Sequence, residues 1–326
     1  MRRSNASIVP SQKSARMAEP VALMALALDA AVGWPARVYS RIGHPVGPFA
    51  RIIAACEQRW NRPSRGRRAR KAGGIATVLL LVGLAGGGGI LLTLLARTLG
   101  AAGWFAIAIF AWPALAQRSL DQHVQPVIAA LQAGETARAR AALAMIVGRD
   151  TRDLDEFGIA RATIESLAES FCDGVIAPLL WLVTAGLPGV WIMKAVNTAD
   201  SLIGHIEEPH RDFGWAAARL DDAMNFVPAR IAAILICLAG PGGWRIGWRY
   251  RRAHASPNAG WPEAAMAGVL GVKLAGPVRY DGALRDKPWI GEGDQPGLRA
   301  LVRARRVYHR ACAIAWGIVG GLAWLV

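Results

Sequence analysis

Residues 146–205 join two polar ends through a hydrophobic middle, and this arrangement limits the folds open to the chain. The charged residues at successive i,i+4 positions before the middle are Arg161, Glu165, Glu169 and Asp173. Residues four apart share one face of a helix, so the spacing predicts a stripe of three carboxylates and one arginine. Buried charges must be paired or must hold a metal ion, so we predict that the stripe is a site. The alternative is a solvated amphipathic face.

The hydrophobic middle is interrupted by the sequence Gly-Leu-Pro-Gly at residues 186–189. A proline inside a helix removes a backbone hydrogen bond and pushes the preceding residue out of the helical region. We therefore predict a hairpin rather than one long span. The polar residues that follow at i,i+3 or i,i+4 spacing are Lys194, Asn197, Asp200, Ser201 and His205. A hairpin would bring both polar stripes to the same end.

The composition favours a membrane protein. The chain has 326 residues, of which 53% are hydrophobic, and a formal charge of +15. This combination suits an integral membrane protein with cationic cytoplasmic loops. Nucleic-acid binding is not expected, because the arginines are spread between apolar segments and no recognition motif is present. The four cysteines form no CxxC pair, so the sequence has neither a disulfide framework nor a zinc signature.

We predict an all-α, polytopic integral membrane protein with four to six apolar helices, some of them re-entrant, and with amphipathic cytoplasmic helices. Residues 75–96 are the clearest span, and residues 101–116 would return from it. Residues 21–32 are too short to cross a bilayer, so this run is re-entrant or interfacial unless the N-terminus lies outside. One domain would cover residues 1–326, with a basic tail (1–19), an arginine-rich loop (51–74), a motif-bearing catalytic core (146–277) and a C-terminal anchor (311–326).

A second candidate site begins at Ser256. The sequence Ser-Pro-Asn-Ala-Gly precedes Trp-Pro-Glu, and a proline at the first helical position followed by a glutamate marks a helix start. Helix N-termini attract anions, and four arginines lie just upstream, so phosphate binding is one interpretation. An ordinary capped helix at a membrane surface is the other. The sequence contains no Walker A, GxGxxG, HExxH or GxSxG pattern.

Five long stretches, in this order, resemble the CobD/CbiB family of membrane-bound cobalamin-biosynthesis proteins, the adenosylcobinamide-phosphate synthases. The stretches are residues 28–46, 146–178, 194–205, 213–230 and 256–277. Together they cover most of the chain outside residues 51–71 and the two ends. Several long motifs in one order are a far more specific signal than a single short pattern.

The resemblance implies an ATP-dependent, amide-forming carbon–nitrogen ligase. Such an enzyme would attach 1-amino-2-propanol, or its O-phosphate, to the f-propionate of (adenosyl)cobyric acid, which yields (adenosyl)cobinamide or its phosphate. The alternatives are a non-catalytic membrane scaffold that presents the corrinoid to a soluble ligase, and a corrinoid transporter.

ATP and Mg²⁺ are the implied co-substrate and metal, with no permanently bound cofactor. The expected partners are the corrinoid adenosylcobyric acid, aminopropanol or its phosphate, membrane lipid and other late cobalamin-pathway enzymes, without nucleic acid. The implied location is the inner membrane, with several spans and with the active site on the cytoplasmic side.

Condensing a carboxylate with an amine requires activation, most simply as an acyl phosphate. That step needs Mg²⁺ on carboxylate ligands and cationic groups on phosphate oxygens. The predicted catalytic residues are Glu165, Glu169, Asp173, Asp200 and His205, with Glu169 and Asp173 as magnesium ligands. The predicted substrate-binding and phosphate-binding residues are Arg149, Arg161, Lys194, Asn197, Ser201, Arg219, Ser256, Asn258 and His44. A purely structural role is the alternative for both histidines.

Overall fold

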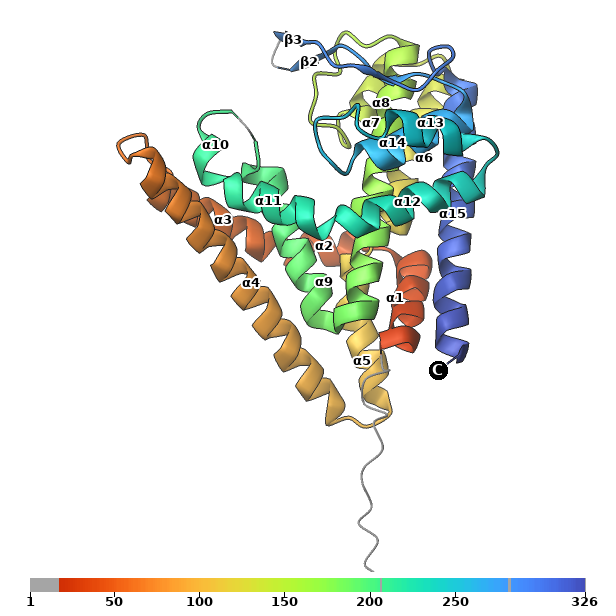
Figure 1. Cartoon of the computed structure of the whole chain (residues 1–326). Helices are drawn as coiled ribbons and strands as arrows, with labels where there is room; N and C mark the ends of the chain where they lie inside the picture. The colour runs from red at the N-terminus through yellow and green to blue at the C-terminus, as the bar shows by residue number, and fades with distance from the viewer. Residues whose placement is uncertain (1–17, 206, 281–282, 326) are drawn as a thin grey trace, which may run out of the picture.

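The computed structural model describes residues 18–205, 207–280 and 283–325, and these residues are largely helical (Figure 1). The helices of the first half are α1 (Ala18–Val32), α2 (Ala36–Ile42), α3 (Gly47–Trp60), α4 (Arg67–Arg97), α5 (Ala102–Ala111), α6 (Gln117–Gln132) and α7 (Thr136–Leu143). Those of the second half are α8 (Glu156–Phe171), α9 (Ala177–Ile203), α10 (His210–Phe213), α11 (Trp215–Met224), α12 (Phe226–Ala239), α13 (Gly243–Tyr250), α14 (Gly260–Leu270) and α15 (Leu298–Leu325). The all-α prediction is confirmed.

Two small antiparallel sheets follow α14. Strand β1 (Leu274–Ala275) pairs with β4 (Trp289–Ile290), with Leu274 opposite Ile290. Strand β2 (Val278–Tyr280) pairs with β3 (Ala283–Arg285), with Val278 opposite Arg285. The first pair packs against α8 and α14, so it closes one side of the candidate site.

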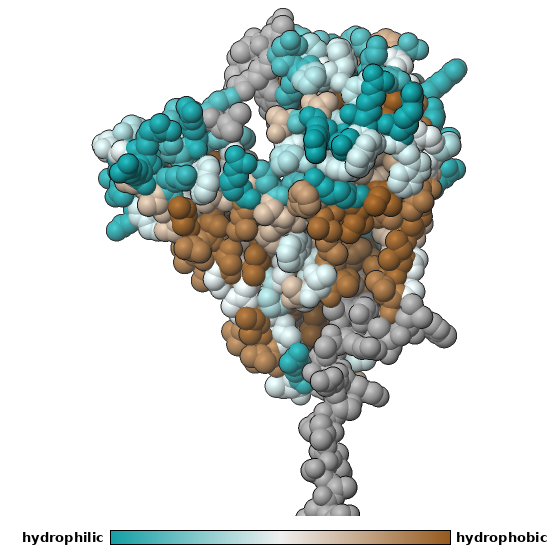
Figure 2. Space-filling model, in the orientation of Figure 1, coloured by the Kyte–Doolittle hydropathy of each residue, from teal (hydrophilic) through white to brown (hydrophobic). Residues whose placement is uncertain are grey.

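The chain is a membrane protein. Among the described residues, two helical segments are long and apolar enough to cross a membrane, namely α4 and the segment Glu156–Ile203. The bent pair of α11 and α12 makes a third if it is taken as one span. Large hydrophobic side chains on α4, α5, α12 and α15 are exposed, and Figure 2 shows a hydrophobic band next to a hydrophilic part of the molecule. Such a broad exposed apolar surface is typical of contact with lipid.

The segment Glu156–Ile203 is a hairpin, as predicted. Gly186 interrupts the helix with φ 63° and ψ −154°, a conformation that side chains other than glycine rarely adopt. Pro188 follows at once, and Figure 1 shows the chain turning back at this point. Both arms therefore return to the same end of the molecule.

Helix α4 packs along the returning arm of this hairpin. A Cβ atom on Gly89 would lie 2.6 Å from the Cα of Pro188, and one on Gly86 would lie 3.1 Å from Ile192. Glycine thus permits close packing of the helices, as the glycine run 86–89 predicts. The hairpin tip contacts α4 about 12 Å before the last residue of α4, since a helix rises about 1.5 Å per residue. The hairpin therefore turns back before it reaches the level at which α4 ends, as a re-entrant segment does.

The arginine-rich segment 51–74 is not a loop, which corrects the prediction. Helix α3 continues to Trp60 and α4 begins at Arg67, so only the turn around Pro63 separates two helices. Arginine is a good helix former, and its long stem can cover apolar surface while the guanidinium reaches a polar partner. The high density of arginine in this segment is therefore compatible with helices.

Helix α1 has 15 residues and is about 22 Å long, so it is too short to cross a bilayer. It packs against α5, α9 and α15. Asp29 on α1 accepts hydrogen bonds from the backbone N–H groups of Gln117 (2.7 Å) and Arg118 (3.3 Å), and thereby satisfies two free donors at the N-terminus of α6. The predicted anchor 311–326 coincides with the second half of α15, which also carries the basic residues that precede it. The predicted basic tail lies mostly outside the described residues.

Candidate active site

The hairpin brings the two polar stripes together. Asn197 on the returning arm donates from Nδ2 to Oδ2 of Asp173 on the first arm, at 3.5 Å. The same amide nitrogen lies 3.3 Å from Oδ1 of Asp221 on α11. Lys194 is close enough to Asp173 and Asp221 to interact with both carboxylates electrostatically. Residues from three helices therefore meet at one point.

The first stripe passes through a change of helix type. Residues Cys172–Ile176 form a π-helical turn between α8 and α9, and Asp173 lies in it. A π turn is wider than an α turn, so it rotates the residues that follow relative to those before it, and such turns are frequent at functional sites. Asp173 consequently does not continue the α-helical i,i+4 face that leads from Glu165 to Glu169.

A polar cavity of about 390 Å³ lies at this end of the hairpin, and we call it the acidic cavity. It is lined by five carboxylates and by only two cationic side chains, Arg211 and Arg219. Its carboxylates are Glu169, Asp173, Asp200, Asp221 and Asp222. The predicted residues His205, Ser256 and Asn258 also line it. Three segments that are far apart in the sequence thus contribute to a single site.

A second cavity of about 260 Å³ lies next to the first, and we call it the side cavity. Glu169 lines both cavities. The other polar residues of the side cavity are Arg149, Glu165, Ser166, His254, Glu263 and Lys287. Burial, reinforced by Lys287, lowers the pKa of His254 to about 4. Burial raises the pKa of Glu263 well above its usual range, and the neighbouring carboxylates Glu165 and Glu169 act in the same direction.

Glu165 and Arg161 lie beside the acidic cavity rather than in it. Glu165 forms an ion pair with Arg149 through Oε2, and its Oε1 accepts the backbone N–H of Ala275 at 2.7 Å. Arg161 approaches Glu165 at 3.9 Å and stacks over Trp289, 5.0 Å from the ring centroid. These contacts tie α8 to Arg149 and to the small β1–β4 sheet. They give both residues a structural role at the edge of the site.

The predicted residues that line neither cavity are His44, Arg161, Lys194, Asn197 and Ser201, of which His44 and Ser201 form hydrogen bonds to residues near them in the sequence. His44 packs edge to face against Trp34, and its Nδ1 accepts the backbone N–H of Val46 at 3.3 Å. Burial lowers the pKa of His44, and the nearby Lys194 adds to this effect. Ser201 is exposed and donates to the carbonyl of Asn197 in the preceding turn, at 2.9 Å. The structure does not bring either residue into the lining of the site.

The contacts of Ser256 and Asn258 are those of an ordinary structured turn before α14. The hydroxyl of Ser256 accepts the backbone N–H groups of Asn258 (3.2 Å) and Ala259 (3.3 Å). The side chain of Asn258 donates to the carbonyl of Asp222 and accepts from Arg230, both at 2.8 Å. Asn258 thus joins α11, α12 and α14, and the predicted helix start near Trp261 is confirmed.

Of the polar residues that α10, α11 and the residue after it contribute, only Arg219 was assigned to the site from the sequence. Asp221, Asp222 and Arg211 line the acidic cavity, as does Asn225, whose amide donates to Asp221 at 2.9 Å. The i,i+4 spacing of Asp221 and Asn225 in the stretch 213–230 was a usable signal. Glu263 was visible only as the acidic residue of a helix start, and the sequence did not show that it is buried.

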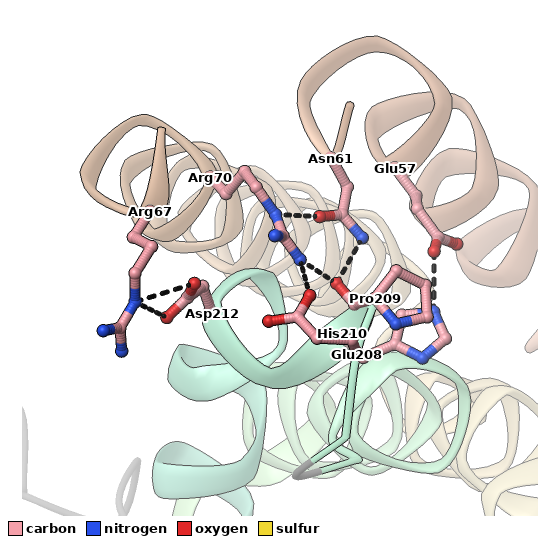
Figure 3. A network of polar contacts seen from close by, with 8 residues as sticks. All are labelled: Glu57, Asn61, Arg67, Arg70, Glu208, Pro209, His210 and Asp212. Atoms are coloured by element: carbon pink, nitrogen blue, oxygen red, sulfur yellow. Dashed lines mark hydrogen bonds and ion pairs between the residues drawn. The ribbon is translucent and has the colours of Figure 1, made fainter. Parts of the chain in front are cut away.

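A polar network fastens the segment between α9 and α11 to the ends of α3 and α4 (Figure 3). The Arg70 side chain donates to Asn61 (2.8 Å), to Glu208 (2.7 Å) and to the carbonyl of Pro209. Further contacts are Arg67 to Asp212 (3.3 Å) and His210 to Glu57 (2.7 Å). This network holds the segment that carries His205 and Arg211 on the wall of the acidic cavity.

Comparison with known proteins matches residues 22–308 to the family described as CobD/Cbib protein. The chain belongs to the CobD/CbiB family. A cobalamin biosynthesis protein CobD from Rhodobacter capsulatus is 44% identical over 310 residues, which cover 93% of this chain and 96% of the relative. A CobD from a Sinorhizobium species is 41% identical over 317 residues, which cover 93% of this chain and 97% of the relative. No solved structure matches the chain.

Membership of the CobD/CbiB family confirms the resemblance seen in the five stretches and gives the chain a role in cobalamin biosynthesis. That role implies a corrinoid substrate. The match also includes the stretches that form the acidic cavity, namely parts of residues 146–178, 194–205, 213–230 and 256–277. The residues that line the cavity therefore lie within the part of the chain that matches the family.

The residues of the acidic cavity suit Mg²⁺ by their chemistry, since carboxylate oxygens are the ligands that this ion prefers. Within the described residues, no group of three or more His, Cys, Asp or Glu side chains is arranged to hold a metal ion. Mg²⁺ usually binds through one or two carboxylates and fills its other positions with water and substrate phosphates. Asp173 and Asp221, which share the amide of Asn197, are the pair best placed for that arrangement.

Proposed function

We propose that this chain is the ligase that joins 1-amino-2-propanol, or its O-phosphate, to the f-propionate of (adenosyl)cobyric acid with consumption of ATP. The observation that carries the proposal is the acidic cavity, which five carboxylates and two arginines line at the open end of the hairpin, with Lys194 interacting with Asp173 and Asp221. A passive corrinoid platform would not need this concentration of buried acidic groups, because each one costs free energy.

The reaction has two steps. The propionate carboxylate first attacks the terminal phosphorus of ATP, which gives an acyl phosphate and ADP. The amine nitrogen then attacks the acyl carbon, phosphate leaves, and the nitrogen gives up a proton as the amide forms. Glu169 lies at the boundary of both cavities and is the base that we assign to accept the ammonium proton before the attack, whereas the proton released as the amide forms would leave on the phosphate.

The other polar groups of the site would bind the charged parts of the substrates and the metal ion. Arg211 and Arg219 would bind phosphate or the carboxylate of the corrinoid, since guanidinium groups match both. Asp173 and Asp221 would hold Mg²⁺, with Asn197 keeping the two carboxylates in register. When bound, Mg²⁺ would neutralise the charge on the transferred phosphoryl group.

We propose that the chain lies in the cell's inner membrane and that the acidic cavity is on the cytoplasmic side. Cytoplasmic segments of membrane proteins are rich in Lys and Arg. The arginines at the N-terminus of α4, such as Arg67 and Arg70, lie at the same end as the cavity, and α13 adds Arg245 and Arg249. The opposite end of α4 carries Arg97.

The test uses detergent-purified protein with adenosylcobyric acid, MgATP and either aminopropanol or its phosphate. A product whose mass corresponds to one new amide bond, and which requires ATP, is the expected result. A protein that binds the corrinoid but yields no product under these conditions would be a scaffold for another enzyme. Uptake of labelled corrinoid by sealed vesicles, without chemical change, would indicate a transporter.

A further inference from the structure

We propose that the side cavity binds the primary ammonium group of the small amine, with Glu263 as its anionic partner. This inference rests on the proposed function, because it assigns one of the two substrates to a separate cavity. The residues that carry it are Glu263, Glu165, Glu169 and the groups that face them.

The main evidence for this proposal is the environment of Glu263. It lies on α14, is 3% exposed, and lines the side cavity. Within the described part of the chain, its Oε2 atom has no hydrogen-bond partner. The imidazole Nε2 of His254 is 3.9 Å from Oε1, which is too far for a hydrogen bond. A buried polar atom without a partner costs free energy, so a ligand with donor groups would satisfy it.

The charge of the side cavity favours a cation. Three carboxylates line it, Glu165, Glu169 and Glu263, against the cationic side chains of Arg149 and Lys287. Arg149 is already paired with Glu165. His254 adds no charge, because its Nδ1 accepts the backbone N–H of Ser256 at 3.0 Å and is therefore unprotonated. With all three carboxylates ionised, the formal sum is −1, which one ammonium group would balance. A bound ammonium group would also favour the ionised form of Glu263, which burial alone disfavours.

The size of the cavity favours a small ligand. About 260 Å³ is below the range of roughly 300–1,000 Å³ that drug-sized ligands occupy, so a corrinoid does not fit. A short amino alcohol has the required charge, several donors and a small volume.

Because Glu169 lines both cavities, an amine in the side cavity would lie next to the cavity in which the carboxyl group is activated. An amine held by Glu263 would present its nitrogen at the boundary with the acidic cavity, where the activated carboxyl group would lie. Glu169 would then be adjacent to the nitrogen and would accept the proton that the ammonium group must lose before it can attack. The second proton, released as the amide forms, would leave on the departing phosphate. Glu263 is a binding residue in this arrangement and does not itself transfer the proton.

The experiment measures binding of the amine alone, without ATP or corrinoid. Radiolabelled 1-amino-2-propanol and its O-phosphate are equilibrated in separate dialysis cells with purified protein in detergent. We expect the Glu263→Gln variant to bind the preferred amine about tenfold more weakly or worse, since it loses a charge-assisted hydrogen bond. The Glu263→Asp variant keeps the charge and should retain more affinity. Glu135→Gln, which alters an exposed carboxylate paired with Arg138, is the matched control and should bind normally.

Competition tests the requirement for charge on wild-type protein, whose folding is not in question. Ethanolamine should displace the label, whereas propane-1,2-diol, which has no ammonium group, should not. Equal competition by the diol, absence of amine binding, or an unchanged dissociation constant in a folded Glu263→Gln variant would each overturn the proposal. Whichever of the two amines binds more tightly identifies the form that the cavity accepts.

The outcomes separate this inference from the proposed function. Amine binding that depends on Glu263, without any amide product from the complete mixture, would refute the ligase and leave the binding site standing. Normal amide formation with an unchanged KM for the amine in Glu263→Gln would refute the binding site and leave the ligase standing.

Discussion

Glu165 and Glu169 are one helical turn apart, yet their surroundings give them different tasks. Glu165 is fixed by Arg149 and by the backbone N–H of Ala275, so its oxygens are already engaged. Glu169 instead faces both cavities, where substrates would meet. Spacing in the sequence identified both residues as members of one face. Only their neighbours, which come from distant segments, distinguish the carboxylate that is fully engaged in protein contacts from the one that we propose as the base.

The environment of His254 leads to a prediction about how the stability of the protein depends on pH. Its pKa is about 4 in the folded protein and near 6.5 in the unfolded chain, so the unfolded state binds more protons between these values. Stability contributed by neutral His254 is therefore present above pH 6.5 and is lost as the pH falls toward 4. We expect the thermal midpoint of wild-type protein in detergent to drop over this window more steeply than that of His254→Asn. Parallel pH profiles of the two proteins would contradict the assignment.

At the scale of elements, the re-entrant hairpin determines where the polar residues meet. The break at Gly186 and Pro188 was readable from the sequence, because proline and glycine have strong and local backbone requirements. The arginine-rich segment was misread as a loop, because charge density does not exclude helices. Apart from Arg219, the contributions of α10 and α11 were missed, because a helical pattern shows which residues share a face but not what that face contacts.

Two neighbouring glycines of α4 test the packing of the hairpin. A Cβ atom on Gly89 would overlap the backbone of Pro188, whereas one on Gly88 would meet nothing within 4 Å. Alanine is favoured over glycine in a helix by about 1 kcal/mol, so Gly88→Ala should leave the thermal midpoint unchanged or raise it. Gly89→Ala should lower the midpoint and reduce amide formation, since the hairpin must shift. Equal midpoints for the two variants would contradict the close contact between α4 and the hairpin.

At the scale of the whole molecule, a hydrophobic band lies next to a hydrophilic part (Figure 2). The two cavities adjoin each other, since Glu169 lines both. The sequence allowed prediction of the helical class, the membrane character and most of the acidic cavity, since these depend on composition and on helical spacing. It did not reveal the side cavity, because this space forms where α8, α14 and the β1–β4 sheet pack together. Burial of Glu263 depends on that packing and leaves no local signature.

The proposal that the amide bond forms in the acidic cavity is tested by the rate of amide formation by Glu169→Gln in the complete purified mixture. Wild type and Glu135→Gln are measured beside it. A glutamine side chain at this position would keep the shape of Glu169 but could not accept a proton, so we expect turnover to fall by about 100-fold or more while binding of the amine persists. Glu135→Gln should turn over normally. Near-normal turnover by a folded Glu169→Gln variant would contradict the claim that the acidic cavity is where the amide bond forms.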